Sequence, residues 1–292
     1  MVETFQQNVS SGLKTEFSAS SVVKWWQFCP KILDRHGLAD DLFNLSPLLR
    51  LLLQIIFAAL AWIVGVHINF LSIPWLGLVQ MGALSLPITV IWLVGMANAI
   101  NWIDGLDGLA AGVSGIAAVV MLIVTLFMQQ SAAALIAAAL AGGALAFLRY
   151  NFNPAQIFMG DGGAYYMGFT LDGVGIVGSV KGTAVTAVLL PYLILAVPIV
   201  DRSAVIVTRL RKGKSPFLAD KSHLHDCLLQ AGLSHRLTVL FIYALTTLWV
   251  GSLALAFAGI PSGFAYAIAT SSLPSYASWH AWRHARRHAR QS

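Results

Sequence analysis

The sequence predicts an all-α membrane protein: a polytopic transmembrane helical bundle whose active site faces the cytoplasm. Hydrophobic residues make up 58% of the 292-residue chain and charged residues only 10%, which exceeds what a soluble domain needs for its core. The apolar stretches are continuous and rich in leucine and alanine, which favours helices over the alternating strands of a membrane barrel. Nearly all aspartates lie at the same end of these stretches.

The apolar stretches divide into about eight spans, each near the roughly 20 residues that a helix needs to cross a bilayer. A polar segment, 1–36, precedes the transmembrane domain at 37–279, and a basic tail, 280–292, follows it. Residues 1–31 are polar and lack a continuous apolar core, so neither a signal peptide nor a span is predicted there. The two cysteines do not indicate a disulfide framework. The spans are expected near 48–66, 83–100, 108–128, 131–148, 163–179, 184–200, 237–258 and 261–279.

The basic residues set the orientation of the bundle. If Arg50 and the residues before it lie inside, then Arg149, the run from 202 to 236 and the tail also lie inside, and Lys181 is the exception. This loop placement accounts for the net charge of +6, so the charge does not indicate a nucleic-acid partner.

On this map the acidic residues gather on the cytoplasmic side, and the predicted outside loops contain none. Only Asp172 falls within a predicted span. Acids collected beside glycine turns on one face predict a metal site there. The cytoplasmic acids include Asp40, Asp41, Asp104, Asp107, Asp161, Asp201, Asp220 and Asp226.

A first motif joins two spans through a short connection that contains Asn98, Asn101, Asp104 and Asp107. If this segment is helical, the three-residue spacing of the last three side chains places them on one face. The alternative is a solvated connector, in which Asn, Asp and Gly are common. Two amides and two carboxylates in register favour a functional site.

A second motif places Asp161 between glycines at the expected start of a helix. An aspartate there is often only a cap. Together with the other carboxylates it is typical of a Mg²⁺ ligand, because Mg²⁺ uses one or two carboxylates plus substrate phosphate oxygens. The neighbouring Phe158 suits either stacking on a base or packing in the membrane.

A third motif is a basic loop, 209–217, followed by Asp220, His223 and His225. The loop alone is explained by topology. Histidines two positions apart do not match a helical zinc site. Lysine and histidine side chains here suit contacts to phosphate or diphosphate.

Together the three motifs resemble the polyprenyl-phosphate N-acetylhexosamine-1-phosphate transferases, glycosyltransferase family four. They are Asn-x-x-Asn-x-x-Asp-Gly-x-Asp-Gly-Leu, Asn-Pro-Ala-x-x-Phe-Met-Gly-Asp-x-Gly and Ser-Pro-Phe-x-x-Asp-Lys-x-His-Leu-His. The resemblance implies transfer of a sugar-1-phosphate from a UDP-sugar to undecaprenyl phosphate in the bacterial cytoplasmic membrane. Mg²⁺, or alternatively Mn²⁺, is the implied cofactor. UMP is released, and the lipid-linked product starts cell-envelope polysaccharide synthesis.

The resemblance also implies a role for each matching residue. Asp40 and Asp41 correspond to an aspartate pair that acts on the lipid phosphate, and Asp161 corresponds to the magnesium ligand. Asn101, Asp104 and Asp107 match the polar cluster that lines the nucleotide-diphosphate site. Of these, Asp104 and Asp107 are expected to be catalytic, whereas Asn101 and the preceding Asn98 are expected to bind substrate. The remaining matches bind substrate: Asn151 and Phe158 hold the uracil, and Asp201, Arg209, His223 and His225 belong to a loop over the diphosphate and sugar.

Two features depart from the family pattern. The family has further spans before its aspartate pair, whereas residues 1–31 offer none, so an N-terminally truncated form, a misassigned start or a decayed copy is expected. The family often has a third histidine after His-x-His, where this chain has Asp226. A carboxylate there repels a diphosphate unless a metal or Lys221 intervenes.

We expect N-acetylglucosamine as the sugar, because His-Leu-His is closer to that branch of the family. Two alternatives remain open: a catalytically impaired member that binds lipid or a partner protein, and an ion or proton transporter. A transporter predicts ionisable residues at mid-bilayer, where only Asp172 qualifies. A homodimer is also left open.

Overall fold

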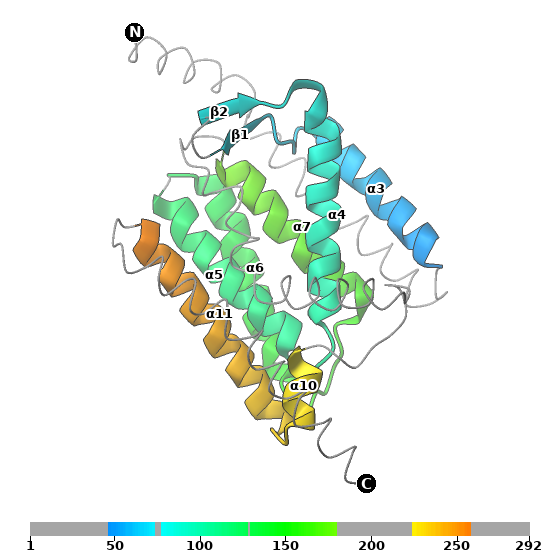
Figure 1. Cartoon of the computed structure of the whole chain (residues 1–292), viewed down its shortest axis with the longest axis vertical. Helices are drawn as coiled ribbons and strands as arrows, with labels where there is room; N and C mark the ends of the chain where they lie inside the picture. Colours follow the sequence, from blue (N-terminus) through cyan, green and yellow to red (C-terminus); the bar gives the residue numbers. More distant parts are fainter. Residues whose placement is uncertain (1–45, 74–76, 128, 180–223, 258–292) are drawn as a thin grey trace, which may run out of the picture.

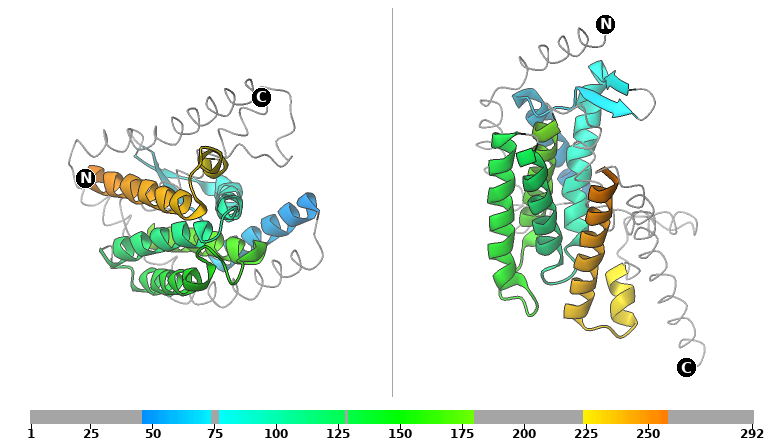
Figure 2. Two further views of the ribbon diagram at one scale, coloured as in Figure 1. Left: turned by 90° about the horizontal axis from the view of Figure 1, so that it is seen from below. Right: turned by 90° about the vertical axis from the view of Figure 1, so that its left-hand side faces the viewer.

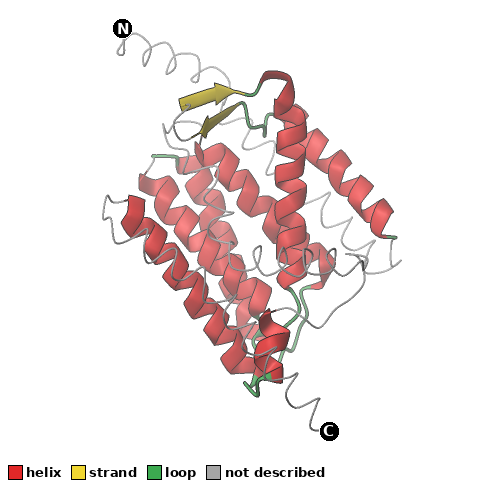
Figure 3. Cartoon of the chain, in the orientation of Figure 1, coloured by secondary structure: helices red, strands yellow, loops and turns green. Residues whose placement is uncertain are grey.

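The computed structural model describes residues 46–73, 77–127, 129–179 and 224–257 of the chain. Helices dominate this part of the chain, with one small β-hairpin at an end of the bundle (Figure 3). The helices are α3 (Pro47–Val64), α4 (Ser85–Ile103), α5 (Leu109–Phe127), α6 (Ser131–Asn151), α7 (Gly160–Ser179), α10 (Leu224–Gln230) and α11 (His235–Phe257), shown in Figure 1.

Four of the described helices are long and apolar enough to cross a membrane: Pro47–Val64, Gly82–Ile103, Leu109–Phe127 and Ser131–Asn151. They coincide with the first four predicted spans, which confirms a mostly helical membrane protein. Helices α7 and α11 lie where two more spans are expected. The spans predicted at 184–200 and 261–279 lie outside the described residues.

Local sequence sets the ends of α3. Ser46 caps its first turn by accepting a hydrogen bond from the Leu49 N–H, and Pro47 occupies the first position, where a missing N–H costs nothing. The helix ends at Val64 and is capped by Gly65, whose φ of 110° is left-handed. The chain then continues through His67 toward the hairpin.

Helix α7 lies at the centre of the bundle, in contact with α4, α5 and α6, and the views in Figure 2 show this arrangement from two further sides. A Cβ added at Gly168 of α7 would lie 2.7 Å from the Cα of Ala97 on α4. The absence of a side chain therefore lets the two helix backbones approach closely, as small residues do in membrane helices. Asp172, on the same helix, is fully buried.

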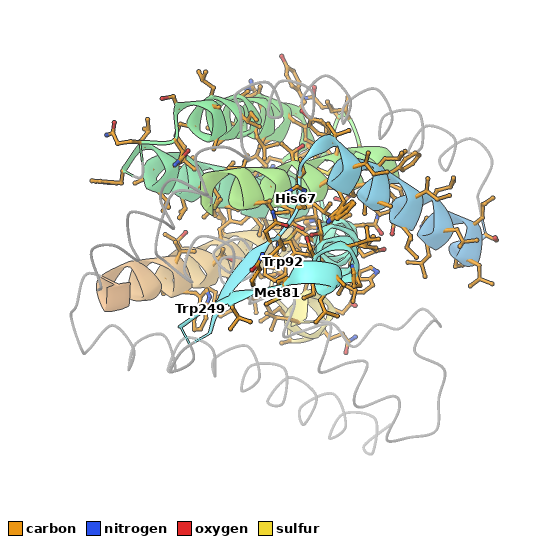
Figure 4. All side chains as sticks on the ribbon, turned by 90° about the horizontal axis from the view of Figure 1, so that it is seen from above. His67, Met81, Trp92 and Trp249 are labelled. Atoms are coloured by element: carbon orange, nitrogen blue, oxygen red, sulfur yellow. The ribbon has the colours of Figure 1, made fainter. Side chains whose placement is uncertain are left out.

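The hairpin is not predicted by the sequence, which indicates only a connection between the spans expected near 48–66 and 83–100. Strand β1 (Phe70–Ile73) pairs antiparallel with β2 (Gly77–Gln80), with Phe70 opposite Gln80. Beneath it, Ser85 at the start of α4 accepts a hydrogen bond from Trp62 Nε1 at 3.0 Å and donates one to Asn69 at 3.1 Å. Figure 4 looks onto this end, with His67 and Met81 labelled.

Candidate functional site

The predicted acidic motifs meet at the end of the bundle opposite the hairpin (Figure 1). Helix α4 ends there and α5 begins there, joined by the loop 104–108, and α7 starts at the same end. The short helix α10 also lies at this end, beside the first turns of α11. Four separate parts of the chain therefore contribute to one site.

Asp161, in the first turn of α7, is held by two side chains from other helices. Its Oδ2 lies 2.9 Å from Nη1 of Arg50 on α3, and its Oδ1 accepts a hydrogen bond from Asn101 Nδ2 on α4 at 2.8 Å. The same Arg50 nitrogen donates to the Tyr165 hydroxyl at 3.4 Å. The prediction that Asp161 begins a helix is confirmed, and its side chain joins α3, α4 and α7.

A direct polar contact between α3 and α4 lies about one helical turn from Arg50 and Asn101. Asn98 Nδ2 donates to Gln54 Oε1 at 2.7 Å and to the Val94 carbonyl at 2.8 Å. Gln54 is 1% exposed. Neither Gln54 nor Arg50 is among the site residues that the sequence predicts, and Arg50 enters that prediction only through the topology. Their four-residue separation on an apolar helix could have marked a shared polar face.

The helix does not continue through the first motif, so its side chains are not arranged along one helical face as the spacing suggested. Helix α4 ends at Ile103, and Asp104 adopts a non-helical backbone with ψ of 48°. Asn101 therefore lies on α4, whereas Asp104 and Asp107 lie on the turn. Burial, with the negative charges of Asp161 and Asp107 as smaller causes, raises the pKa of Asp104 to about 6.

The far end of this turn is anchored to the segment after α6. Asp107 Oδ2 accepts hydrogen bonds from Asn153 Nδ2 at 3.0 Å and from the Ala155 N–H at 3.2 Å. Asn151, 3% exposed, accepts from the Gly108 N–H and donates to the Ile157 carbonyl, both at 2.9 Å. The Asn151 amide thus joins two loops, and its contact with uracil stays a prediction.

Phe158 lies just before α7 with 79% of its surface exposed. An aromatic ring this exposed beside the acidic site is accessible to a planar base. Stacking on uracil therefore remains a prediction that the position of the ring allows.

His225 on α10 packs over the turn. A Cβ added at Gly105 would lie 2.9 Å from His225 Nε2, so this glycine allows the imidazole its close approach. The same nitrogen lies 3.7 Å from Asp226 Oδ2. Asp226, where the family pattern often has histidine, therefore lies beside a histidine that can balance its charge when protonated. The predicted site residues Asp40, Asp41, Asp201, Arg209 and His223 lie outside the described residues.

The carboxylates of Asp104, Asp107 and Asp161 lie near one another at this end of the bundle, and carboxylate oxygens suit a hard cation such as Mg²⁺. Within the described ranges, no three acidic, histidine or cysteine side chains are grouped to hold a metal by themselves. Mg²⁺ does not require such a group, because substrate phosphates and water commonly complete its shell. Burial is the main cause of the raised pKa of Asp104, and the negative charges of Asp161 and Asp107, which a cation would offset, add to it. The residues therefore fit a magnesium site completed by substrate.

Fold and site together define a helical membrane protein with acidic, amide and arginine side chains gathered at one end of its helices. The chain belongs to glycosyl transferase family 4, whose sequence profile matches residues 29–179. That range contains α3 to α7, with Arg50, the 104–108 turn and Asp161.

Curated bacterial proteins are similar over most of the chain. A probable undecaprenyl-phosphate N-acetylglucosaminyl 1-phosphate transferase of Bacillus subtilis is 38% identical, covering 71% of this chain and 58% of that protein. A decaprenyl-phosphate N-acetylglucosaminephosphotransferase of Mycobacterium leprae is 39% identical, covering 75% and 59%. An undecaprenyl-phosphate alpha-N-acetylglucosaminyl 1-phosphate transferase of Salmonella typhi is 27% identical, covering 71% and 58%. The matches thus span less than two thirds of each relative.

Proposed function

We propose that this protein transfers N-acetylglucosamine-1-phosphate from UDP-N-acetylglucosamine to undecaprenyl phosphate and releases UMP. The lipid-linked product would start a cell-envelope polysaccharide. One observation carries the proposal: Arg50, Asn101, Asp104 and Asp161 come together within the segment that matches the family. The names of the relatives, which describe polyprenyl-phosphate N-acetylglucosamine phosphotransferases, support the choice of sugar and acceptor.

We place this site at the cytoplasmic face of the bacterial inner membrane. Within the described ranges the arginines are Arg50, Arg149 and Arg236, and there is no lysine. Arg50 contacts Asp161, Arg149 lies in the last turn of α6, and Arg236 donates to the Asn153 carbonyl at 2.9 Å. All three lie at the end that contains the site, and short loops rich in basic residues face the cytoplasm. The donor nucleotide is a cytoplasmic metabolite, so substrate and site would share a compartment.

Phosphoryl transfer depends mainly on positioning the reactants and on balancing the charge of the phosphates. Asp161, with Asp104 beside it, would hold Mg²⁺, which when bound supplies charge neutralisation at the diphosphate. Arg50 offers a fixed positive charge next to Asp161. Asn101 orients the Asp161 carboxylate, and Phe158 provides an exposed ring for the base. The predicted lipid-phosphate residues Asp40 and Asp41 would act from the segment before α3.

The test uses membranes containing the full chain, UDP-[³H]N-acetylglucosamine, undecaprenyl phosphate and Mg²⁺. We expect organic-extractable label and one UMP for each lipid product, both lost without the lipid acceptor or with excess chelator. UDP-N-acetylgalactosamine in place of the donor tests the choice of sugar. Folded protein that binds undecaprenyl phosphate in vesicles but yields no label would favour the catalytically impaired family member. Cation flux through the same vesicles would favour the transporter.

A further inference from the structure

We propose that Tyr243 of α11 is a positioning residue: its hydroxyl fixes the 104–108 turn, and thereby Asp104 and Asp107, for the transfer reaction. The inference rests on the proposed function for its catalytic consequence. Its structural part, the attachment of α11 to the turn, stands on contacts that can be measured without substrate.

The turn is held at Gly108 from two sides. The Tyr243 hydroxyl donates a hydrogen bond to the Gly108 carbonyl from 135 positions further along the chain. The Gly108 N–H donates to Asn151 Oδ1 of α6 at 2.9 Å. Side chains of two different helices therefore hold the peptide groups of one residue, whose φ of 81° most side chains would resist.

The shape of α5 admits this tyrosine. Gly112 lies one turn after Gly108, and a Cβ added there would overlap the Tyr243 ring and hydroxyl. The glycine thus forms a notch through which the ring reaches the carbonyl. Gly115, further along α5, differs: a Cβ there would meet the Ala144 Cβ at 3.5 Å, an ordinary contact. The notch is specific to the position that faces Tyr243.

The α10–α11 unit reaches the turn at two points. His225 of α10 packs over Gly105, and Tyr243 of α11 binds Gly108. Asp104 precedes the first of these contacts and Asp107 precedes the second. Catalytic groups must be held within about 0.5 Å of their working geometry by surrounding contacts. Tyr243 therefore connects the placement of both carboxylates to the last described helix.

The first test is Tyr243→Phe in the full chain, which removes the hydroxyl and keeps the ring in the notch. Two quantities are measured: hydrogen–deuterium exchange of the backbone amides in 104–112 without substrate, and kcat and KM for the donor nucleotide. We expect faster exchange confined to that segment and a kcat lower by about tenfold, the size of one lost positioning hydrogen bond. KM should change less than kcat, and the melting temperature should move little.

The second test displaces the ring without altering Tyr243. Gly112→Ala should force the ring out of the notch and reproduce the effects of Tyr243→Phe on exchange and kcat. Gly115→Ala is the matched control, the same substitution in the same helix, and should leave both near wild type. The pair keeps the proposal testable if Tyr243→Phe fails to fold.

The outcomes separate this inference from the proposed function. If wild type makes no lipid product but Tyr243→Phe still speeds exchange at 104–112, the transferase assignment fails and the attachment of the turn stands. Unchanged exchange in both Tyr243→Phe and Gly112→Ala overturns the attachment. Faster exchange with unchanged kcat in an active enzyme overturns the positioning role. Equal effects of Gly112→Ala and Gly115→Ala would also count against it, because general disturbance of α5 would then explain both.

Discussion

The two ends of the bundle use hydrogen bonds differently. At the hairpin end, Trp62, Asn69 and Ser85 form a chain of neutral donors and acceptors, and Thr89 accepts from the Ile68 N–H at 2.9 Å. At the opposite end, charged groups gather around Asp161. The same helices pass through both ends, so the difference arises from the residues at their termini and not from the fold.

This contrast separates polar groups that hold the fold together from polar groups that serve the proposed reaction. Neutral donors and acceptors that form hydrogen bonds with one another can stabilise a helix end without any ligand or ion. The acidic end is different, because the pKa of Asp104 is raised to about 6 by its burial and by neighbouring carboxylates. Burying a carboxylate beside other carboxylates opposes folding, and groups perturbed in this way cluster at functional sites.

Asp161→Asn should abolish most transfer activity, by about 10³-fold, because it removes the expected cation ligand and the charge that Arg50 balances. The measurement is initial rate of lipid-linked product at saturating donor. Asp172→Asn is the matched control: the same chemical change on the same helix, at a fully buried position away from the site. It should retain activity within about twofold. Similar losses of activity in both variants would show that Asp161 has no role in the reaction beyond that of another carboxylate on α7.

The acidic end should also show a pH dependence. In the folded protein Asp104 keeps its proton up to about pH 6, against 3.8 for an ordinary aspartate. The folded state therefore binds more protons between these values, and the free energy of unfolding without metal should fall as pH rises from about 4 to about 6. Transfer activity should instead rise through pH 6, by about tenfold, as the carboxylate ionises. Melting curves and rates across pH, with and without Mg²⁺, measure both trends.

Asp104→Asn identifies the group responsible for these trends. The variant should flatten the melting-temperature profile between pH 4 and 6, because an amide does not titrate there. An unchanged profile would assign the dependence to another group.

The Gln54–Asn98 contact should matter less than the charged groups but more than the hairpin end. Gln54→Leu removes the acceptor at 2.7 Å that joins α3 to α4 one turn from Arg50. We expect activity to fall by about fivefold, with a loss of about 1 kcal/mol in stability. Gln54→Glu keeps an acceptor oxygen and should restore part of the rate. A double-mutant cycle with Asn98→Ala should give a coupling energy; additive effects would show that the pair does not act together.

The sequence predicted the helical parts of this arrangement better than the contacts between them. Continuous apolar runs predicted the first four spans, and glycines around Asp161 predicted a helix start there. The hairpin was not predicted because its two strands are only four residues each and lie between spans. The partners of Asp161 and Gly108 were also missed: Arg50 and Tyr243 are far away in sequence, and local spacing does not encode such contacts.

The smallest effect on activity should come from the hairpin end. Ser85→Ala removes the acceptor for Trp62 Nε1 and the donor to Asn69, both in a buried setting where Ser85 is 2% exposed. Two partners left unsatisfied should cost about 1–3 kcal/mol of stability, measured as a lower melting temperature. The transfer rate of the folded protein should stay within about twofold of wild type, because no charged group of the site contacts this network among the described residues. A large loss of rate with an unchanged melting temperature would show that the two ends are coupled through α4, which contributes Ser85 at one end and Asn101 at the other.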